Sequence, residues 1–192
     1  MPITINSILI PADESAIERV ELARRGCWKA VVQRGEQLWP GARLTVRDLN
    51  GTDMAYTNNI MTETSNATAN AWNAMAFGAF TVATSTVLGI YGVRLGYALN
   101  ATIIEIPITG IRIDVGGSRR VQWNVEKIGA EFGTATAATG VNWMKLGYTP
   151  SPVIVSEDMT VTIYEYTKTA STAYTIIWEG YALEKEGITL TP

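Results

Sequence analysis

The sequence contains no histidine and only one cysteine, Cys27, among its 192 residues. A Ser-His-Asp triad, a Cys-His nucleophile pair and a histidine-ligated metal site are therefore excluded. One cysteine also excludes a disulfide within the chain and a zinc site built from several cysteines. Catalysis would have to depend on carboxylates, and none of these lies in a recognisable catalytic motif. We therefore expect no enzymatic activity, no bound metal and no cofactor.

Charged residues are also scarce, since Asp, Glu, Lys and Arg make up 17% of the chain against a typical value of about 25%. Threonine, alanine and glycine take their place. So little charge favours a protein whose faces become interfaces with other proteins. The net charge of −3 and the lack of a basic terminal arm provide no electrostatic attraction for nucleic acid. We expect no direct sequence-specific binding of nucleic acid.

The longest uncharged stretch extends from Thr64 to Val93. Its part from Ala74 to Val93 is long enough to span a bilayer, but glycines and threonines interrupt it and no basic anchors flank it. The β-branched residues within it favour buried strands or an interface instead. The N-terminal residues 1–15 lack a basic start followed by a long apolar segment, so no secretory signal is predicted.

One short helix is predicted near the N-terminus, after a short extended segment. Ser15 and Glu18 form a capping-box pattern, in which both side chains satisfy free amides of the first turn. Apolar residues continue at helical spacing as far as Cys27, and Gly26 is a plausible end. We therefore expect a helix over residues 15–25.

The remainder of the chain predicts β-structure. The strongest signal is a hairpin, in which Ile111–Val115 and Arg119–Trp123 flank a turn with two glycines. Apolar and polar residues alternate from Met159 to Tyr166, as in a half-buried strand. Short strands with frequent turns predict an all-β, antiparallel two-sheet β-sandwich. No repeat or linker divides the chain, so we expect a single domain, with the N-terminal strand and helix in residues 1–26 and the sandwich in residues 27–192.

The boundaries of the strands follow from the same patterns. Residues 52–76 are predicted as a long loop with one irregular helical turn near Trp72, and long loops are often functional. The predicted strands are 28–34, 42–49, 79–83, 86–99, 102–106, 108–115, 119–125, 153–155, 159–167 and 172–184.

The six tryptophans provide candidates for a contact between proteins. Most lie in apolar runs, for which we expect packing in the core. Trp72 and Trp143 differ, because each lies in an uncharged region of small residues. Together with Met75, Phe77 and Phe80 they form the predicted subunit interface. The other tryptophans are Trp28, Trp39, Trp123 and Trp178.

The segment from Ile106 to Trp123 (IPITGIRIDVGGSRRVQW), with PVIV at 152–155 and the strand ending IIWEGY at Tyr181, resembles part of a known protein family. It is similar to the back half of the small single jelly-roll major capsid proteins of tail-less icosahedral viruses that infect bacteria and archaea. The resemblance covers roughly residues 79–190. The resemblance rests on the spacing of the predicted strands along the chain, the low content of charged residues and a hairpin that ends in tryptophan. The early helix departs from a plain eight-stranded pattern.

This resemblance implies a jelly-roll structural protein of the virion, made in the host cytoplasm and self-assembling into capsomers and an icosahedral shell. Its partners would be other copies of itself and other virion proteins. The lack of a basic arm suits a shell separated from the genome by a membrane or another protein layer. Two further classes fit the composition. A phage tail-tube or decoration protein would form rings or tubes, and a carbohydrate-binding β-sandwich would be a soluble monomer with tryptophans in a groove.

Overall fold

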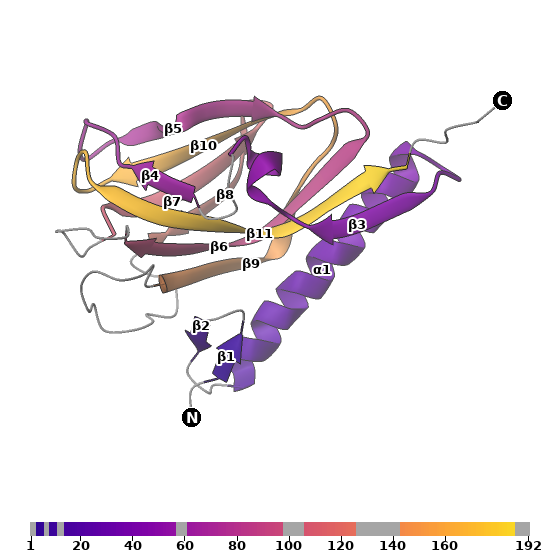
Figure 1. The fold of residues 1–192 in the computed structure, drawn as a ribbon, viewed down its shortest axis with the longest axis horizontal. Coiled ribbons are helices and arrows are strands. Elements are labelled where there is room, and N and C mark those ends of the chain that lie inside the picture. Colours follow the sequence, from indigo (N-terminus) through magenta and orange to yellow (C-terminus); the bar gives the residue numbers. More distant parts are fainter. Residues whose placement is uncertain are drawn as a thin grey trace.

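The structure is a computed structural model and describes residues 3–5, 8–10, 14–56, 61–97, 106–125 and 143–186. A small antiparallel hairpin and one long helix precede the sandwich, and a short 3₁₀ helix, η1, lies between its first strands (Figure 1). The elements are β1 (Ile3–Ile5), β2 (Ile8–Ile10), α1 (Glu14–Leu38), β3 (Leu44–Asp48), η1 (Gly51–Met54), β4 (Met61–Thr64), β5 (Trp72–Thr81), β6 (Thr86–Tyr97), β7 (Ile108–Val115), β8 (Ser118–Asn124), β9 (Trp143–Val155), β10 (Thr160–Thr167) and β11 (Ala173–Lys185).

Strands β4 to β11 pair as one long nested hairpin that is rolled into two sheets. The innermost pair is β7 with β8, followed outward by β6 with β9, β5 with β10, and β4 with β11. Further pairing of β10 with β7 and of β11 with β6 closes the roll. The resulting antiparallel sheets have the orders β5-β10-β7-β8 and β3-β11-β6-β9, with β4 also on β11. This is the jelly-roll arrangement of a two-sheet sandwich, and it confirms the predicted fold class.

The main core fills the space between the two sheets. Strands β5 to β11 contribute alternate residues to it, because successive side chains of a strand point to opposite faces. Complete burial of one such aliphatic side chain stabilises the fold by about 1.5–3 kcal/mol. The core includes Leu88 and Ile90 from β6, Ile111 and Ile113 from β7, Val161 and Ile163 from β10, and Ile176 and Trp178 from β11.

Helix α1 packs on the outer face of the β3-β11-β6-β9 sheet, as Figure 1 shows. Its fully buried residues Ala23, Cys27 and Val31 recur every four positions and form a second core with residues of that sheet. A Cβ on Gly89 of β6 would lie 2.8 Å from the Sγ of Cys27, so glycine lets the helix approach closely. Burial raises the pKa of the Cys27 thiol to about 12. Cys27 is therefore a packing residue and remains a neutral thiol.

The helix is longer than the sequence indicates. It was expected over residues 15–25 with a strand at 28–34, but it extends from Glu14 to Leu38 and includes both segments. A glycine inside a helix costs about 1 kcal/mol, and the buried contacts of Cys27 and Val31 beyond Gly26 outweigh this cost. The helix therefore crosses the expected boundary at residues 26 and 27. It ends before Pro40 and Gly41, the latter with a φ of 78°.

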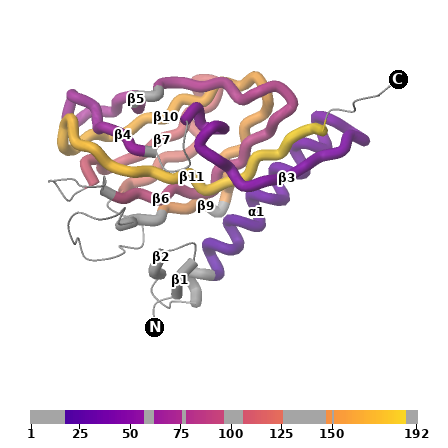
Figure 2. Tube along the Cα trace, viewed as in Figure 1, coloured from indigo at the N-terminus to yellow at the C-terminus, as the bar shows by residue number. Residues whose placement is uncertain are grey.

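Most of the expected sandwich strands agree with the structure. The predictions at 86–99, 108–115, 119–125, 159–167 and 172–184 match β6, β7, β8, β10 and β11 to within a few residues, and 42–49 matches β3. The predicted strands at 79–83 and 153–155 overlap only the C-terminal ends of β5 and β9. Residues 102–105 lie outside the described residues. Figure 2 shows β11, the last strand of the chain, lying between β3 and β6.

The prediction of a long loop over residues 52–76 is wrong. This segment contains η1, strand β4 and the start of β5, and Trp72 begins that strand where a helical turn was expected. Residues 57–60 lie outside the described residues. The uncharged Asn, Thr and Ala sequence carries little strand signal of its own. Pairing with β10 and β11, about a hundred positions further along the chain, determines its conformation.

Candidate functional site

The outer face of the β5-β10-β7-β8 sheet carries the candidate site. Helix α1 packs on the other sheet and does not cover this face (Figure 1). Alternation along β10 buries Ile163 and Glu165 and turns Tyr164 and Tyr166 outward. Arg112 of β7 points outward in the same way. Together with Trp72 of β5, these three outward residues form a surface that we call the aromatic–arginine patch: Trp72, Arg112, Tyr164 and Tyr166.

Trp72, Tyr166 and Gly110 form one row across three strands, since Tyr166 pairs with both of the others. The rings of Trp72 and Tyr166 meet edge to face, with centroids 5.6 Å apart and an interplanar angle of 74°. A Cβ on Gly110 would lie 2.8 Å from Cη2 of Trp72. The indole therefore lies across the row and covers the glycine. Any side chain at residue 110 would compete with it for this space.

Arg112 joins the two ends of the patch. Its guanidinium carbon lies 4.1 Å from the ring centroid of Tyr164 and 5.4 Å from that of Trp72, which is within the range of cation–π attraction. Its Nε lies 3.1 Å from Oδ1 of Asp114, and the two side chains are only 17% and 13% exposed. The cation is therefore held in one place and neutralised by a carboxylate beside it.

The segment before Trp72 is fixed to β10. The hydroxyl of Tyr166 donates to the carbonyl of Asn70 at 3.1 Å, and the amide of Asn70 donates to the carbonyl of Thr167 at 2.7 Å. The side-chain amide of Asn73 donates to the carbonyl of Thr68 at 2.9 Å. These bonds fix the backbone on both sides of Trp72. A partner that binds the patch would therefore lose little conformational entropy in ordering it.

Small and polar residues surround the patch. Ala74 is exposed and pairs with Tyr164, and Ala79 is exposed further along the same strand. On the other side, exposed Gln122 pairs with Arg112. Among the described side chains, the outer face thus presents aromatic rings and an arginine, with the short side chains of Ala74 and Ala79 beside them on β5. This leaves the patch accessible to a flat partner.

The structure separates the five residues of the predicted subunit interface. Trp72 is half-buried and lies in the patch. Met75 and Phe80 are 2% and 8% exposed and belong to the main core, so they offer almost no surface to a second copy. Met75 points inward because β5 alternates from Trp72 onward, which the loop prediction could not show. Phe80 points inward because a register shift between Ala74 and Ala79 moves the alternation by one position. The side chains of Phe77 and Trp143 lie outside the described residues.

Sequence reasoning missed Arg112, Tyr164 and Tyr166. A usable signal exists for the tyrosines, because the alternation from Met159 to Tyr166 places them on the face opposite Val161 and Ile163. The signal for Arg112 is similar, since it alternates with Ile111 and Ile113. What the sequence does not reveal is that β5 lies beside β10 and brings Trp72 to the same face.

Two large apolar side chains are exposed on α1, on the opposite side of the molecule, and charged residues lie around them. Leu22 is 65% exposed and Trp28 is 47% exposed. The expectation that Trp28 packs in the core is wrong, because the helix continues through this residue and turns it to solvent. Trp28 lines a groove of about 290 Å³ with Arg25, Lys29 and Tyr181. Trp39, Trp123 and Trp178 are buried as expected.

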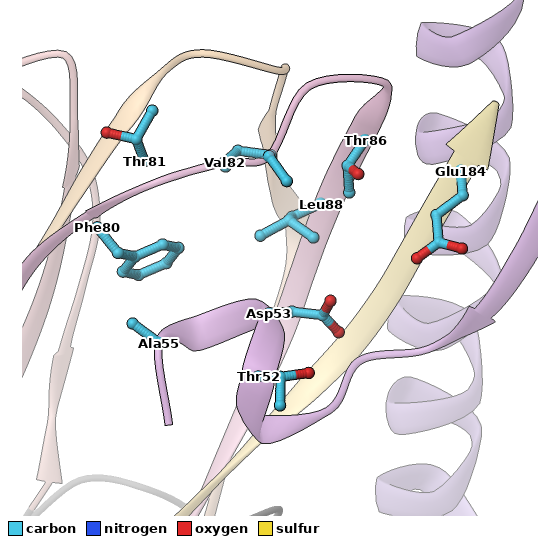
Figure 3. A pocket seen from close by; sticks show the side chains of 10 residues that line it. Thr52, Asp53, Ala55, Phe80, Thr81, Val82, Thr86, Leu88 and Glu184 are labelled. Carbon is cyan, nitrogen blue, oxygen red and sulfur yellow. The ribbon is translucent and has the colours of Figure 1, made fainter. Parts of the chain in front are cut away.

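A small pocket of about 170 Å³ opens between η1 and the β5–β6 turn (Figure 3). Phe80, Val82 and Leu88 line its apolar part, while Asp53 and Glu184 lie at its polar side. Arg47 binds both carboxylates, at 2.7 Å from Asp53 and 2.6 Å from Glu184. Through Arg47 of β3, these ion pairs hold η1 against β3 and β11. Both acids therefore have a structural role and are not placed to act on a substrate.

The described part of the chain contains no group of three or more acidic, cysteine or histidine side chains that could hold a metal ion. None of the helices described is both long enough and apolar enough to cross a membrane.

No protein-family model matches this chain, and neither a curated protein nor a solved structure matches it. Its function is therefore inferred from the fold and from the surfaces described above.

Proposed function

We propose that this chain is a structural virion protein, a major capsid protein whose copies self-assemble into capsomers and an icosahedral shell. The observation that carries the proposal is the aromatic–arginine patch on the uncovered face of a jelly-roll sandwich. Jelly rolls occur in viral capsid, lectin and cupin domains. A fold by itself does not specify a function, so the choice among these classes depends on the surface.

The composition and rigidity of the patch support a contact between proteins. Tryptophan, tyrosine and arginine are the residues that most often dominate the energy of protein interfaces. Arg112 is already ion-paired and lies against two rings, so burying it in an interface does not leave an isolated charge. A permanent interface buries 2,000 Å² or more in total, and an open sheet face is a suitable platform for it.

The position of the exposed Leu22 and Trp28 on α1 supports an assembly larger than a dimer. The patch lies on the outer face of one sheet, whereas Leu22 and Trp28 lie on the helix that covers the other sheet. Contacts between two different surfaces of identical subunits are heterologous, and they produce rings or extended arrays. A shell built from capsomers requires contacts of this kind.

A carbohydrate-binding sandwich is the second candidate, and the outward aromatic rings of the same patch favour it. Sugars bind by stacking on an exposed ring face. Here Arg112 occupies a face of Tyr164 at 4.1 Å, and Trp72 is engaged by both Tyr166 and Arg112. A sugar would have to displace these contacts, so we prefer the protein–protein assignment.

Electron microscopy of the purified full chain tests the proposal. We expect closed shells or discrete capsomers of uniform size. Rings or tubes would instead support the tail-tube class. A monodisperse monomer at all concentrations, together with retention on a glycan array, would overturn the proposal in favour of carbohydrate binding.

A further inference from the structure

Two glutamates are buried inside the sandwich, at the end where β4 lies. Glu63 of β4 is 5% exposed and Glu165 of β10 is 1% exposed. They come from opposite sheets and both point into the space between them. Buried carboxylates are rare in proteins unless a cation pairs with them.

The partners of these carboxylates are hydroxyl groups and backbone amides. Glu165 accepts from the Tyr174 hydroxyl at 2.6 Å, from the Asn66 amide at 2.6 Å and from the Thr167 hydroxyl at 3.1 Å. Glu63 accepts from the Tyr56 hydroxyl. Glu165 of β10 therefore links the loop 65–71, which leads to Trp72, to β11, and Glu63 links the segment after η1 to β4.

The titratable groups that face this cluster in the described part of the chain are Glu63, Glu165, Tyr56 and Tyr174, and none of them is a cation. Burial, and then the charge of Glu165, raise the pKa of Glu63 above its ordinary value. Burial also raises the pKa of Tyr174 and of Tyr56, so both hydroxyls keep their protons at neutral pH. The cluster is thus more favourable when Glu63 is protonated than when it is ionised beside Glu165.

We propose that Glu63 and Glu165 form a proton-operated latch on one end of the sandwich. In mild acid Glu63 is protonated, so the two carboxyl groups do not repel each other, and Glu165 holds the loop 65–71 to β10 and β11 through Asn66 and Tyr174. As the pH rises, loss of this proton places two negative charges in the cluster and loosens that end. The latch is independent of whether copies of the chain assemble.

The direction of the effect follows from proton linkage. Between the ordinary pKa of glutamate and the raised pKa of Glu63, the folded chain binds more protons than the unfolded chain. Stability is therefore highest below this window and falls as the pH rises through it. The chain has no histidine, so no other side chain with an ordinary pKa titrates between about pH 5.5 and 7.5. A pH dependence of stability in this range reports on a shifted carboxyl group.

The test is the thermal midpoint of the full chain from pH 5 to pH 8, for the wild type and for Glu63→Gln. We expect the wild-type midpoint to fall as the pH rises, by about 3–5 °C for each pH unit between pH 5 and the raised pKa of Glu63. Glu63→Gln cannot ionise, so its midpoint stays flat and at pH 8 equals or exceeds that of the wild type. Glu36→Gln changes an exposed residue of α1 and keeps the wild-type slope.

A second variant covers the case in which Glu63→Gln does not fold. The Tyr56 hydroxyl lowers the pKa of Glu63, so Tyr56→Phe extends the falling part of the curve to higher pH. Hydrogen exchange at pH 8 locates the effect, since amides of residues 65–71 exchange faster in the wild type than in Glu63→Gln. A wild-type midpoint that is flat from pH 5 to pH 8, an unchanged slope in Glu63→Gln, or equal exchange in both proteins would overturn the latch.

Discussion

Arg112 makes three interactions on the open sheet face, with the rings of Tyr164 and Trp72 and with the carboxylate of Asp114. Each interaction alone is weak at a surface, where cation–π contacts contribute about 0.5–1 kcal/mol and ion pairs about 0–1 kcal/mol. Together they hold one long side chain in a single position between two rings. The patch is thereby ordered before any partner arrives, and an ordered arginine can anchor an interface without first losing rotamer freedom.

Gly110 is the residue on which the position of Trp72 depends. We expect Gly110→Ala to cost about 1–3 kcal/mol of unfolding free energy, because its Cβ would lie 2.8 Å from the indole and overpacking carries a cost of this size. In a Trp72→Ala background the same change should be neutral or stabilising, since the space is empty and glycine weakens a strand. Urea unfolding of the four proteins in a double-mutant cycle measures the difference. Equal costs in both backgrounds would show that the indole does not lie over residue 110.

Short-range patterns account for the elements that the sequence predicts correctly. The hairpin of β7 and β8 depends on the turn residues Gly116 and Gly117, whose φ values are 56° and 77°, and on alternation that needs no distant partner. Helix α1 was predicted too short because Trp28 to Arg34 contains several apolar residues in a row. Only the packing of Val31 on the sheet reveals the helical period there.

The candidate site shows the same limit at the level of strands. Trp72 stands out in the sequence because it lies among small uncharged residues. Its partners Arg112 and Tyr166 reach it only through the pairing of β5 with β10 and of β10 with β7. Those pairings join segments that lie far apart in the chain, and no local pattern encodes them.

The docking of α1 gives a prediction at the level of the element. Val31 is fully buried against the sheet, so Val31→Ala should cost about 1–3 kcal/mol of unfolding free energy through lost burial and a cavity. Gln33→Ala, at an exposed position of the same helix, should remain within about 0.5 kcal/mol of the wild type. Urea denaturation of both variants provides the comparison. Similar stabilities for the two would mean that the helix is not docked on the sheet in solution.

The described elements form three layers, with helix α1 on one sheet and the outer face of the second sheet not covered by that helix. This asymmetry distinguishes the two sides. The covered side presents Leu22 and Trp28, and the open side presents the aromatic–arginine patch. Because the two surfaces differ, they can join copies head to tail, and such contacts close into rings or continue into larger arrays.

Sedimentation velocity of Ala74→Asp beside the wild type tests the proposed role of the patch most directly. Ala74 is exposed and pairs with Tyr164, so the new carboxylate lies next to the patch and outside the core. Its cost to folding should be at most about 1 kcal/mol. Ala83→Asp, at an exposed position of the β5–β6 turn, adds the same charge away from the patch and serves as the control. We predict large assemblies for the wild type and for Ala83→Asp, and a small folded species for Ala74→Asp. Assemblies of wild-type size from Ala74→Asp would contradict the assignment of the patch as the contact between copies.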